Sequence, residues 1–374
     1  MAIARPTLIA LDSSHWAKWF DAMRSLNPMR RQRALDLHAE LLARSRVPLL
    51  SWHHLEELLG HEDEARVRDR IASLKALPLL SWLRLPQRDV GLGSIAQILA
   101  AEAVAATEGA SDLHSIRDRA RTILLRTGTG RQAIGEHDWV WDAVRPALDE
   151  HRGHSAMVAA LGPMRAFDDS KTVGELSKGS LASPDEIRAK LPCIYAQTFQ
   201  QALRGTDGDE IRARAMTDEF IRRMIAMMPP PGTTVRGLLV RSLVERGVDE
   251  NEVRDECVLA DLERLAVFRS QLRIIASETG RSFASLKQVP MDILPSRVIE
   301  DALRAHGQPR EKLPASDVND GHLAVLAAYC DVLYVDKRTA EDFRIARQKD
   351  NRLAGLIGEV AKAADFDVLL GDQA

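Results

Sequence analysis

Short apolar runs near both ends of the chain predict buried β-strands. Residues 6–11 read Pro-Thr-Leu-Ile-Ala-Leu, and residues 47–50 read Val-Pro-Leu-Leu. The tail repeats the pattern with Val-Leu-Tyr-Val at residues 332–335 and Phe-Asp-Val-Leu-Leu at residues 366–370. Strands that are apolar throughout are typical of parallel sheets, because helices cover both faces of such sheets. We therefore expect one sheet that is built from both ends of the chain.

Amphipathic spacing predicts helices between these strands. Apolar side chains recur at i, i+3, i+4 and i+7 from Trp16 to Met23, directly after Asp12-Ser-Ser, which can cap a helix. A helix over residues 30–45 is expected to face inward with Leu35, Ala39 and Leu42. Ser51 can cap a third helix. In the tail, helices are expected over residues 321–329 and 339–364.

The middle of the chain, from about residue 94 to about residue 285, shows helical spacing and few strand signals. The predicted fold class is therefore α/β, with a three-layer α/β/α core around a central parallel sheet. Residues 1–90 and 286–374 are predicted to form this core, and residues 91–285 a mainly α-helical insertion.

Composition restricts the protein class. The chain has 374 residues, of which 45% are hydrophobic and 28% charged, with a net charge of −3. These values are typical of a globular protein and argue against a histone-like coat for nucleic acid. No membrane span and no signal peptide are evident, so a cytoplasmic location is expected. Cys193, Cys257 and Cys330 lack metal-site spacing and are expected to be packed as reduced thiols.

Four acidic residues stand at the edges of predicted elements, and they are Asp12, Glu57, Asp320 and Asp336. In open parallel sheets, ligands collect beyond the carboxyl ends of the strands, so all four can face one cleft. Carboxylates gathered there repel each other and need a cation. Oxygen ligands without His or Cys suit Mg²⁺ or Mn²⁺. Each acid also has a simpler interpretation as a helix cap, a turn residue or an exposed helical side chain.

The motifs around these acids resemble those of the PIN-domain nucleases. Leu11-Asp12-Ser13-Ser14 matches the family's first acid at the end of strand one, and Ser51 through Glu57-Leu58 matches its Ser-x5-Glu-Leu, so Glu57 is preferred over Glu56. Asp320-Gly-His-Leu-Ala324 matches Asp-x3-Ala. The last acid is Asp336 in Tyr334-Val-Asp-Lys, where the family usually has Thr in place of Tyr334. The resemblance covers residues 6–85 and 290–372.

The resemblance implies metal-dependent hydrolysis of phosphodiester bonds without a side-chain nucleophile. Asp12, Glu57, Asp320 and Asp336 would hold one or two Mg²⁺ or Mn²⁺ ions, with Asp317 as a further metal ligand or a helix cap. The substrate would be RNA or another single-stranded nucleic acid. The resemblance also suggests a role as a toxin or defence nuclease, and a protein partner or inhibitor. The oligomeric state is left open, although many small PIN domains pair into homodimers. The alternatives are a PIN-like scaffold that docks a protein through its insertion, and, more weakly, a phosphatase that uses Asp12.

Other features of the sequence have two interpretations each. Glu102 lies on an apolar helix face. It is interpreted either as an outer member of the same cleft or as a charge at the edge of its helix. His53, His54 and His61 are expected to be partly exposed helical residues and not a metal site, and residues 127–131 are expected to be a flexible loop. Basic residues could contact phosphate or simply be solvated, and they are Lys337, Arg338, Arg344, Arg347, Lys349, Arg352, Arg264, Arg269 and Arg273.

Overall fold

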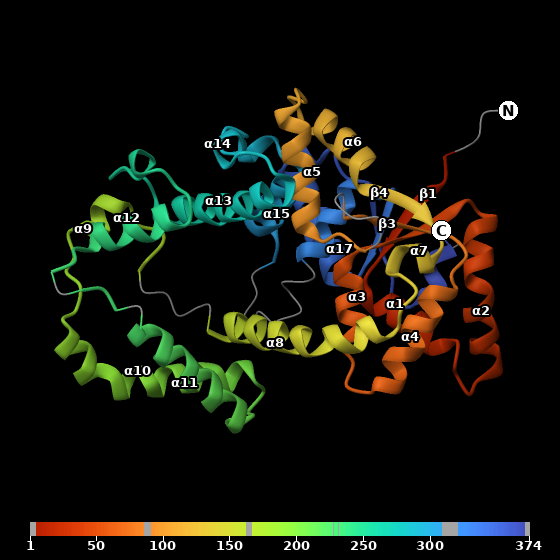
Figure 1. Ribbon diagram of the computed structural model, residues 1–374, viewed down its shortest axis with the longest axis horizontal. Helices are drawn as coiled ribbons and strands as arrows, with labels where there is room; N and C mark the ends of the chain where they lie inside the picture. The colour runs from red at the N-terminus through yellow and green to blue at the C-terminus, as the bar shows by residue number, and fades with distance from the viewer. Residues whose placement is uncertain are drawn as a thin grey trace. The chain divides into compact units, whose positions relative to one another are not determined.

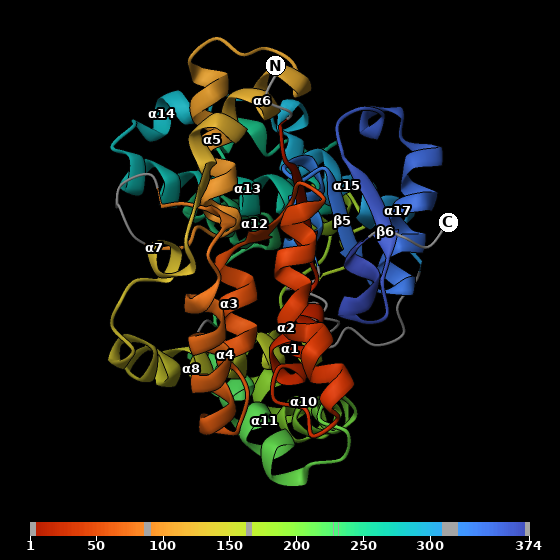
Figure 2. The same ribbon diagram turned by 90° about the vertical axis from the view of Figure 1, so that its right-hand side faces the viewer.

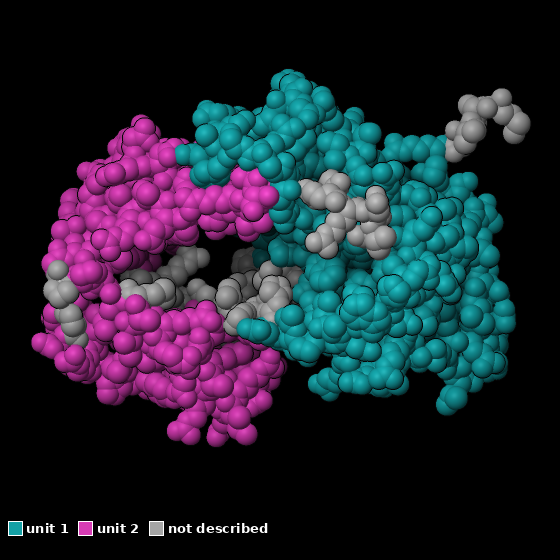
Figure 3. Space-filling model, in the orientation of Figure 1, with its two compact units in different colours: residues 1–150, 278–309, 318–374 teal, residues 151–277, 310–317 magenta. Residues whose placement is uncertain are grey.

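A computed structural model describes residues 5–85, 91–161, 167–226, 228–230, 232–308 and 321–370. The chain divides into two compact units (Figure 3). Unit 1 combines residues 1–150, 278–309 and 318–374, and unit 2 consists of residues 151–277 and 310–317. Residues 91–150, which were predicted to belong to the helical insertion, lie in the unit that contains the sheet.

Unit 1 contains a mixed, mostly parallel sheet of six strands in the order β4-β3-β2-β1-β5-β6. All neighbours are parallel except β3 and β4, which run antiparallel. The all-parallel sheet predicted from the sequence is therefore wrong at this edge. The strands are β1 (Thr7–Leu11), β2 (Arg46–Leu50), β3 (Leu80–Leu83), β4 (Leu125–Gly128), β5 (Val332–Val335) and β6 (Glu359–Lys362).

Helices cover both faces of this sheet (Figures 1 and 2). Alternate residues of β1 enter opposite clusters, Ile9 and Leu11 on one side and Leu8 and Ala10 on the other. The first face is covered by α1 (Ser13–Ala22), α2 (Pro28–Ala43), α3 (Trp52–Leu59), α4 (Glu64–Ala76), α7 (Gly130–Ile134), the start of α8 (Trp139–Leu161) and η5 (Phe366–Leu370). The second face is covered by α5 (Ile95–Thr107), α6 (Leu113–Leu124), α15 (Pro295–His306), η3 (Val325–Ala328), α17 (Lys337–Lys349) and η4 (Asn351–Leu353).

The described part of unit 2 consists of helices and their connections, with one isolated bridge between Thr172 and Val258, and it has several small apolar clusters in place of one large core. One cluster joins α10 (Pro184–Gly205) to α11 (Glu210–Ala226), and another joins α9 (Val173–Ser177) to α12 (Val235–Glu245) and α13 (Leu259–Thr279). The remaining short helices of the chain are η1 (Glu250–Glu252), α14 (Phe283–Leu286) and η2 (Met291–Ile293).

Several predicted elements differ from those in the structure. The helix predicted over residues 339–364 ends at Lys349, and its last residues form β6 instead. Residues 366–370 form the 3-10 helix η5 and not a strand. Residues 127–131 are not a loop, because β4 extends to Gly128 and Thr129 caps α7 through its hydroxyl group. The helix predicted over residues 30–45 buries a different face, since Leu35 is 53% exposed and Leu37 and Leu41 are in the core.

Candidate functional site

The connections of the sheet reverse direction between β1 and β5. From β1 the chain proceeds outward to β2 and β3 on one side, and later to β5 and β6 on the other side. In open α/β sheets, ligands bind beyond the carboxyl ends of the strands at such a switch point. The residues that follow Leu11 and Val335 are therefore the first place to look for a site.

Asp12 directly follows β1 and is partly exposed. Its backbone N–H donates to the carbonyl of Tyr334 on β5 at 2.9 Å, which fixes the end of one strand against the other. One carboxylate oxygen, Oδ1, accepts a hydrogen bond from the N–H of Ser14 at 2.7 Å and so caps α1. The positive end of the helix dipole stabilises an ionised carboxylate at this position.

Asp336 directly follows β5 and is exposed. Its Oδ1 accepts hydrogen bonds from the N–H groups of Arg338 at 2.6 Å and Thr339 at 3.0 Å, and its Oδ2 accepts one from the Thr339 hydroxyl at 3.0 Å. Leu11 pairs with Tyr334, and adjacent strands lie about 4.8 Å apart. The structure thus brings Asp12 and Asp336 to neighbouring positions on one edge, each at the start of a helix.

His54 holds the ends of β1 and β2 together from within the core. Its Nε2 donates to the carbonyl of Leu11 at 2.7 Å, and its Nδ1 accepts the N–H of Ser51 at 2.9 Å. Burial lowers the pKa of His54 to about 4, so the ring is neutral with its proton on Nε2. The prediction of partly exposed histidines is wrong for His54 and His53, which are 0% and 9% exposed, while His61 is partly exposed. A signal existed in the sequence, since His54 occupies the third position after a capping Ser, where Glu or Gln closes a capping box.

Glu56 and Glu57 have different surroundings on α3. Glu56 is only 4% exposed, and its Oε2 lies 3.6 Å from Nδ1 of His53. The centroid of the His53 ring lies 4.7 Å from the centroid of the His322 ring. His322 follows Asp320 by two positions in the sequence. Glu57 is half-buried in the last turn of α3. The two acids follow His53 by three and four positions, so both start from its side of α3, and the carboxylate of Glu56 contacts the His53 ring.

Asp317 and Asp320 lie outside the described residues. Within the described ranges, no three His, Cys, Asp or Glu side chains are grouped so that they could hold a metal ion. The candidate site is therefore founded on Asp12 and Asp336.

Glu102 belongs to the interior of the second face and not to this edge. It is 0% exposed and accepts hydrogen bonds from the backbone N–H of Ser296 at 2.9 Å, the Ser296 hydroxyl at 2.5 Å and the Tyr329 hydroxyl at 2.5 Å. Burial raises the pKa of Glu102 to about 7, although these hydrogen bonds oppose the shift. The carboxyl group links α5 to α15 and to the end of η3.

Most of the basic residues considered above already have partners. Arg344 pairs with Glu341 at 2.6 Å, and Arg352 pairs with Asp350 at 2.6 Å. Arg347 donates to the carbonyls of Ile357 and Gly358. In unit 2, Arg264 pairs with Asp261, Arg269 with Glu252, and Arg273 donates to the carbonyls of Glu245 and Val244. Lys337 and Arg338, beside Asp336, are exposed and form no ion pair within the described part of the chain.

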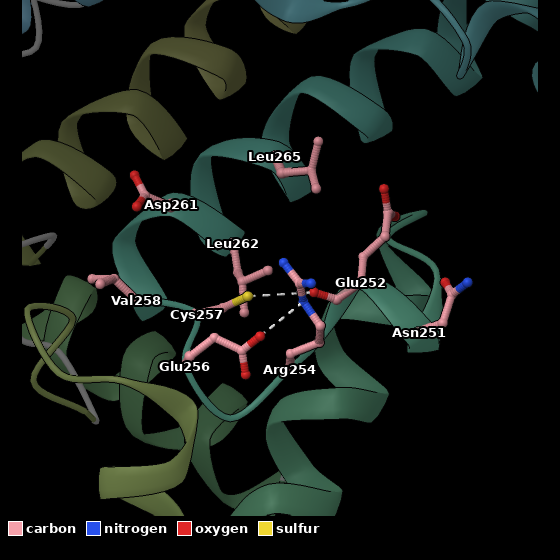
Figure 4. A pocket seen from close by; sticks show the side chains of 9 residues that line it. All are labelled: Asn251, Glu252, Arg254, Glu256, Cys257, Val258, Asp261, Leu262 and Leu265. Carbon is pink, nitrogen blue, oxygen red and sulfur yellow. Dashed lines mark hydrogen bonds and ion pairs between the residues drawn. The ribbon is translucent and has the colours of Figure 1, made fainter.

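Unit 2 has a groove of about 620 Å³ between η1 and the start of α13 (Figure 4). Its charged side chains are paired, since Glu252 binds Arg269 at 3.2 Å and Glu256 binds Arg254 at 3.2 Å. The thiol of Cys257 donates to the carbonyl of Glu252 at 3.6 Å. The groove therefore offers little unsatisfied chemistry.

Comparison with known protein families, with curated proteins and with solved structures gives no match. The described helices include none with the length and apolar character needed to cross a bilayer. The geometry of this chain is thus the basis for any functional assignment.

Proposed function

We propose that this protein is a Mg²⁺- or Mn²⁺-dependent endonuclease that hydrolyses phosphodiester bonds in single-stranded nucleic acid, with RNA as the favoured substrate. The observation that carries the proposal is the placement of Asp12 and Asp336 at the carboxyl ends of two adjacent parallel strands, where the sheet connections reverse. The helices on both faces of the sheet agree with the three-layer PIN-like core expected from the motifs.

The two acids have the chemistry that these metal ions require. Each carboxylate can accept about four hydrogen bonds or ligands, and the helix caps use only part of this capacity. The second oxygen of Asp12, Oδ2, accepts no hydrogen bond within the described ranges. When bound, Mg²⁺ or Mn²⁺ would activate water and stabilise charge on the phosphoryl group. Asp320 and either Glu56 or Glu57 are proposed to complete the set.

Residues around the acids would orient the site and the substrate. His54 fixes the carbonyl of Leu11, and so the backbone from which Asp12 projects. Lys337 and Arg338 begin α17 beside Asp336, where their cationic groups can contact substrate phosphates. Hydrogen bonds from the first turns of α1 and α17 fix the direction of both carboxylates.

Replacing Asp12 with Asn tests the proposal, because Asn caps a helix about as well as Asp but carries no charge. We expect Asp12→Asn to abolish Mn²⁺-dependent cleavage of single-stranded RNA while the melting temperature stays near that of the parent. Asp112→Asn is the matched control. Asp112 caps α6 through the same three kinds of hydrogen bond as Asp336, but it lies at the far end of α6 from this edge. Equal activity of the parent and the Asp12→Asn and Asp336→Asn variants would reject the assignment.

A second function, a PIN-like scaffold without catalysis, is favoured by one observation. Both acids already serve as helix caps, which is a sufficient structural reason for their presence. Calorimetric titration with Mn²⁺ separates the two functions. The nuclease should bind the ion through Asp12 and gain thermal stability, whereas the scaffold should do neither.

A further inference from the structure

Two arginines of like charge lie together at the outer part of the same sheet edge. Arg84 directly follows β3, and Arg126 lies on the adjacent antiparallel strand β4. Trp82 pairs with Arg126, and the N–H of Arg84 donates to the carbonyl of Leu124 at 2.9 Å. Arg84 and Arg126 are therefore diagonal neighbours across the two strands, and their side chains start from the same face of the sheet.

The guanidinium group of Arg84 is fixed by the protein on one side only. Its Nε donates to the carbonyl of Ile123 at 2.6 Å. Its two terminal amino groups have no acceptor within the described ranges, and the exposed side chain of Arg126 has none there either. The fixed Nε leaves the planar donor pair of Arg84 pre-oriented for a ligand with two oxygens.

Several other arginines of unit 1 have a carboxylate partner, which this pair lacks. Arg70 binds Asp21 at 2.8 Å, Arg119 binds Glu108 at 2.7 Å, and Arg131 binds Glu136 at 3.0 Å. Arg84 and Arg126 make no ion pair with the described carboxylates. Burial, and then the charge of Arg126, lower the pKa of Arg84. Two neighbouring cations, one of them half-buried, are costly unless an anion joins them.

The position of this pair relates it to the candidate site. Arg84 stands at the carboxyl end of β3, which is two strands from β1 and so about 10 Å from the end of β1. Both groups therefore lie along one edge of the sheet. A single-stranded nucleic acid bound at Asp12 and Asp336 through one phosphate could therefore contact Arg84 and Arg126 through another phosphate of the same strand.

We propose that Arg84 and Arg126 bind a backbone phosphate of a single-stranded nucleic acid, at a nucleotide remote from the bond cleaved at Asp12 and Asp336. The proposal rests on the nuclease function as far as the cleaved bond is concerned, but the phosphate contact itself does not depend on metal. It would set the polarity and the minimum length of the bound strand, because both sites must be filled by one chain.

The test is the salt dependence of binding, measured with full-length Asp12→Asn protein and a fluorescein-labelled homopolymeric RNA by fluorescence anisotropy. Arg126→Gln should weaken binding and reduce the slope of log K against log salt by about 0.7, the value for one lost phosphate contact on a single strand. Arg84→Gln should do the same. Arg31→Gln is the matched control, since Arg31 is an exposed arginine on α2 and its loss changes the net charge equally. It should leave the slope unchanged.

The outcomes separate this inference from the nuclease function. Both substitutions are made in the Asp12→Asn protein. If neither Arg126→Gln nor Arg31→Gln changes its slope of log K against log salt, the phosphate site is rejected, whether or not the parent cleaves RNA. If the parent does not cleave RNA but Arg126→Gln still reduces the slope, the nuclease proposal fails and the phosphate site stands. Arg126 is exposed, so this variant should fold even if Arg84→Gln does not. Binding of polyglutamate through Arg126, without binding of RNA, would indicate an acidic protein partner and overturn the proposal.

Discussion

His54 shows how one buried side chain can position a site without entering it. Its two ring nitrogens are bonded to the ends of β1 and β2, which are the backbone supports of Asp12 and of the helix that carries Glu56. The neutral ring can serve both bonds only in one tautomer, since Nε2 must donate and Nδ1 must accept. A protonated ring would lose the bond from the N–H of Ser51.

Replacing His54 with Ala should lower the free energy of unfolding by about 3 kcal/mol, because the Leu11 carbonyl and the Ser51 N–H are left buried without partners. Urea denaturation followed by tryptophan fluorescence measures the change. His114→Ala, at an exposed position on α6, should change stability by less than about 0.5 kcal/mol. Similar effects of the two substitutions would contradict the positioning role.

Glu102 predicts a distinct dependence of stability on pH. Its pKa rises from 4.5 in the unfolded chain to about 7 in the folded protein, so the folded state binds the proton more tightly between these values. The Glu102 contribution to stability is therefore complete below pH 4.5 and is lost as the pH rises through about 7. Glu102→Gln should flatten this part of the profile in urea denaturation across that interval.

Glu40→Gln, on the exposed side of α2, is the control for this experiment and should keep the pH profile of the parent. Glu300 also has its pKa raised by burial, so some residual slope of the same sign is expected in Glu102→Gln. An unchanged slope in Glu102→Gln would show that the buried carboxyl does not hold the proton.

At the scale of elements, close approach of backbone segments can be tested at Gly130. This residue begins α7, and a Cβ placed on it would lie 1.9 Å from the carbonyl oxygen of Leu74 in α4. Because that oxygen belongs to backbone, Gly130→Ala should force the two helices apart and cost about 1–3 kcal/mol of stability. Urea denaturation measures the change.

Gly153 on α8 is the matched control, because nothing lies within 4 Å of a Cβ placed there. Gly153→Ala should stabilise the helix by about 0.5–1 kcal/mol, since Ala restricts the unfolded chain. If both substitutions had the same sign, the packing of α7 against α4 would be in doubt.

The sequence pattern was sufficient for the long elements and the central strands of the sheet. Strands β1, β2 and β5 are apolar runs bounded by turn residues, so their position followed from burial alone. Strands β3, β4 and β6 include polar or charged residues among their four positions, so no apolar run marks them, and pairing with a neighbour decides their conformation. For α2, the inward sets Leu35–Ala39–Leu42 and Ala34–Leu37–Leu41 fit helical spacing equally well, and only the tertiary contacts select the second.

The same distinction holds for the site. Asp12 and Asp336 could be placed from the sequence because each directly follows a strand whose partner was evident. The choice between Glu56 and Glu57 depends on the rotation of α3 about its axis, which no local signal fixes. The role of His54 depends on a contact with β1, at a separation of 43 residues in the chain. Interactions across such distances are set by packing and are not visible in local periodicity.

At the scale of the whole molecule, the two units should be separable in unfolding. Unit 1 has two large apolar clusters on either side of its sheet, whereas the clusters of unit 2 are small. All six tryptophans lie before residue 142, in unit 1. Tryptophan fluorescence therefore reports on unit 1, while far-ultraviolet circular dichroism reports on the helices of both.

We expect the circular dichroism of urea-treated protein to begin changing at a lower concentration than the tryptophan fluorescence, because the helices of unit 2 bury less apolar surface. Exchange of Tyr195→Trp places a probe on α10 and should report the earlier transition. Coincident curves from all three probes would show that the two units unfold as one cooperative structure.

The central strand has a consequence for synthesis of the chain. The N–H of Leu8 is bonded to the carboxylate of Asp331, which is 323 residues further along. A ribosome must therefore release the chain as far as Asp331 and β5 before β1 acquires its second neighbour, and such distant pairing is slow to form. Until then Asp12 has no Asp336 beside it. If the protein is the nuclease proposed above, a nascent chain that ends before Asp336 would be unable to cut the messenger it is translated from.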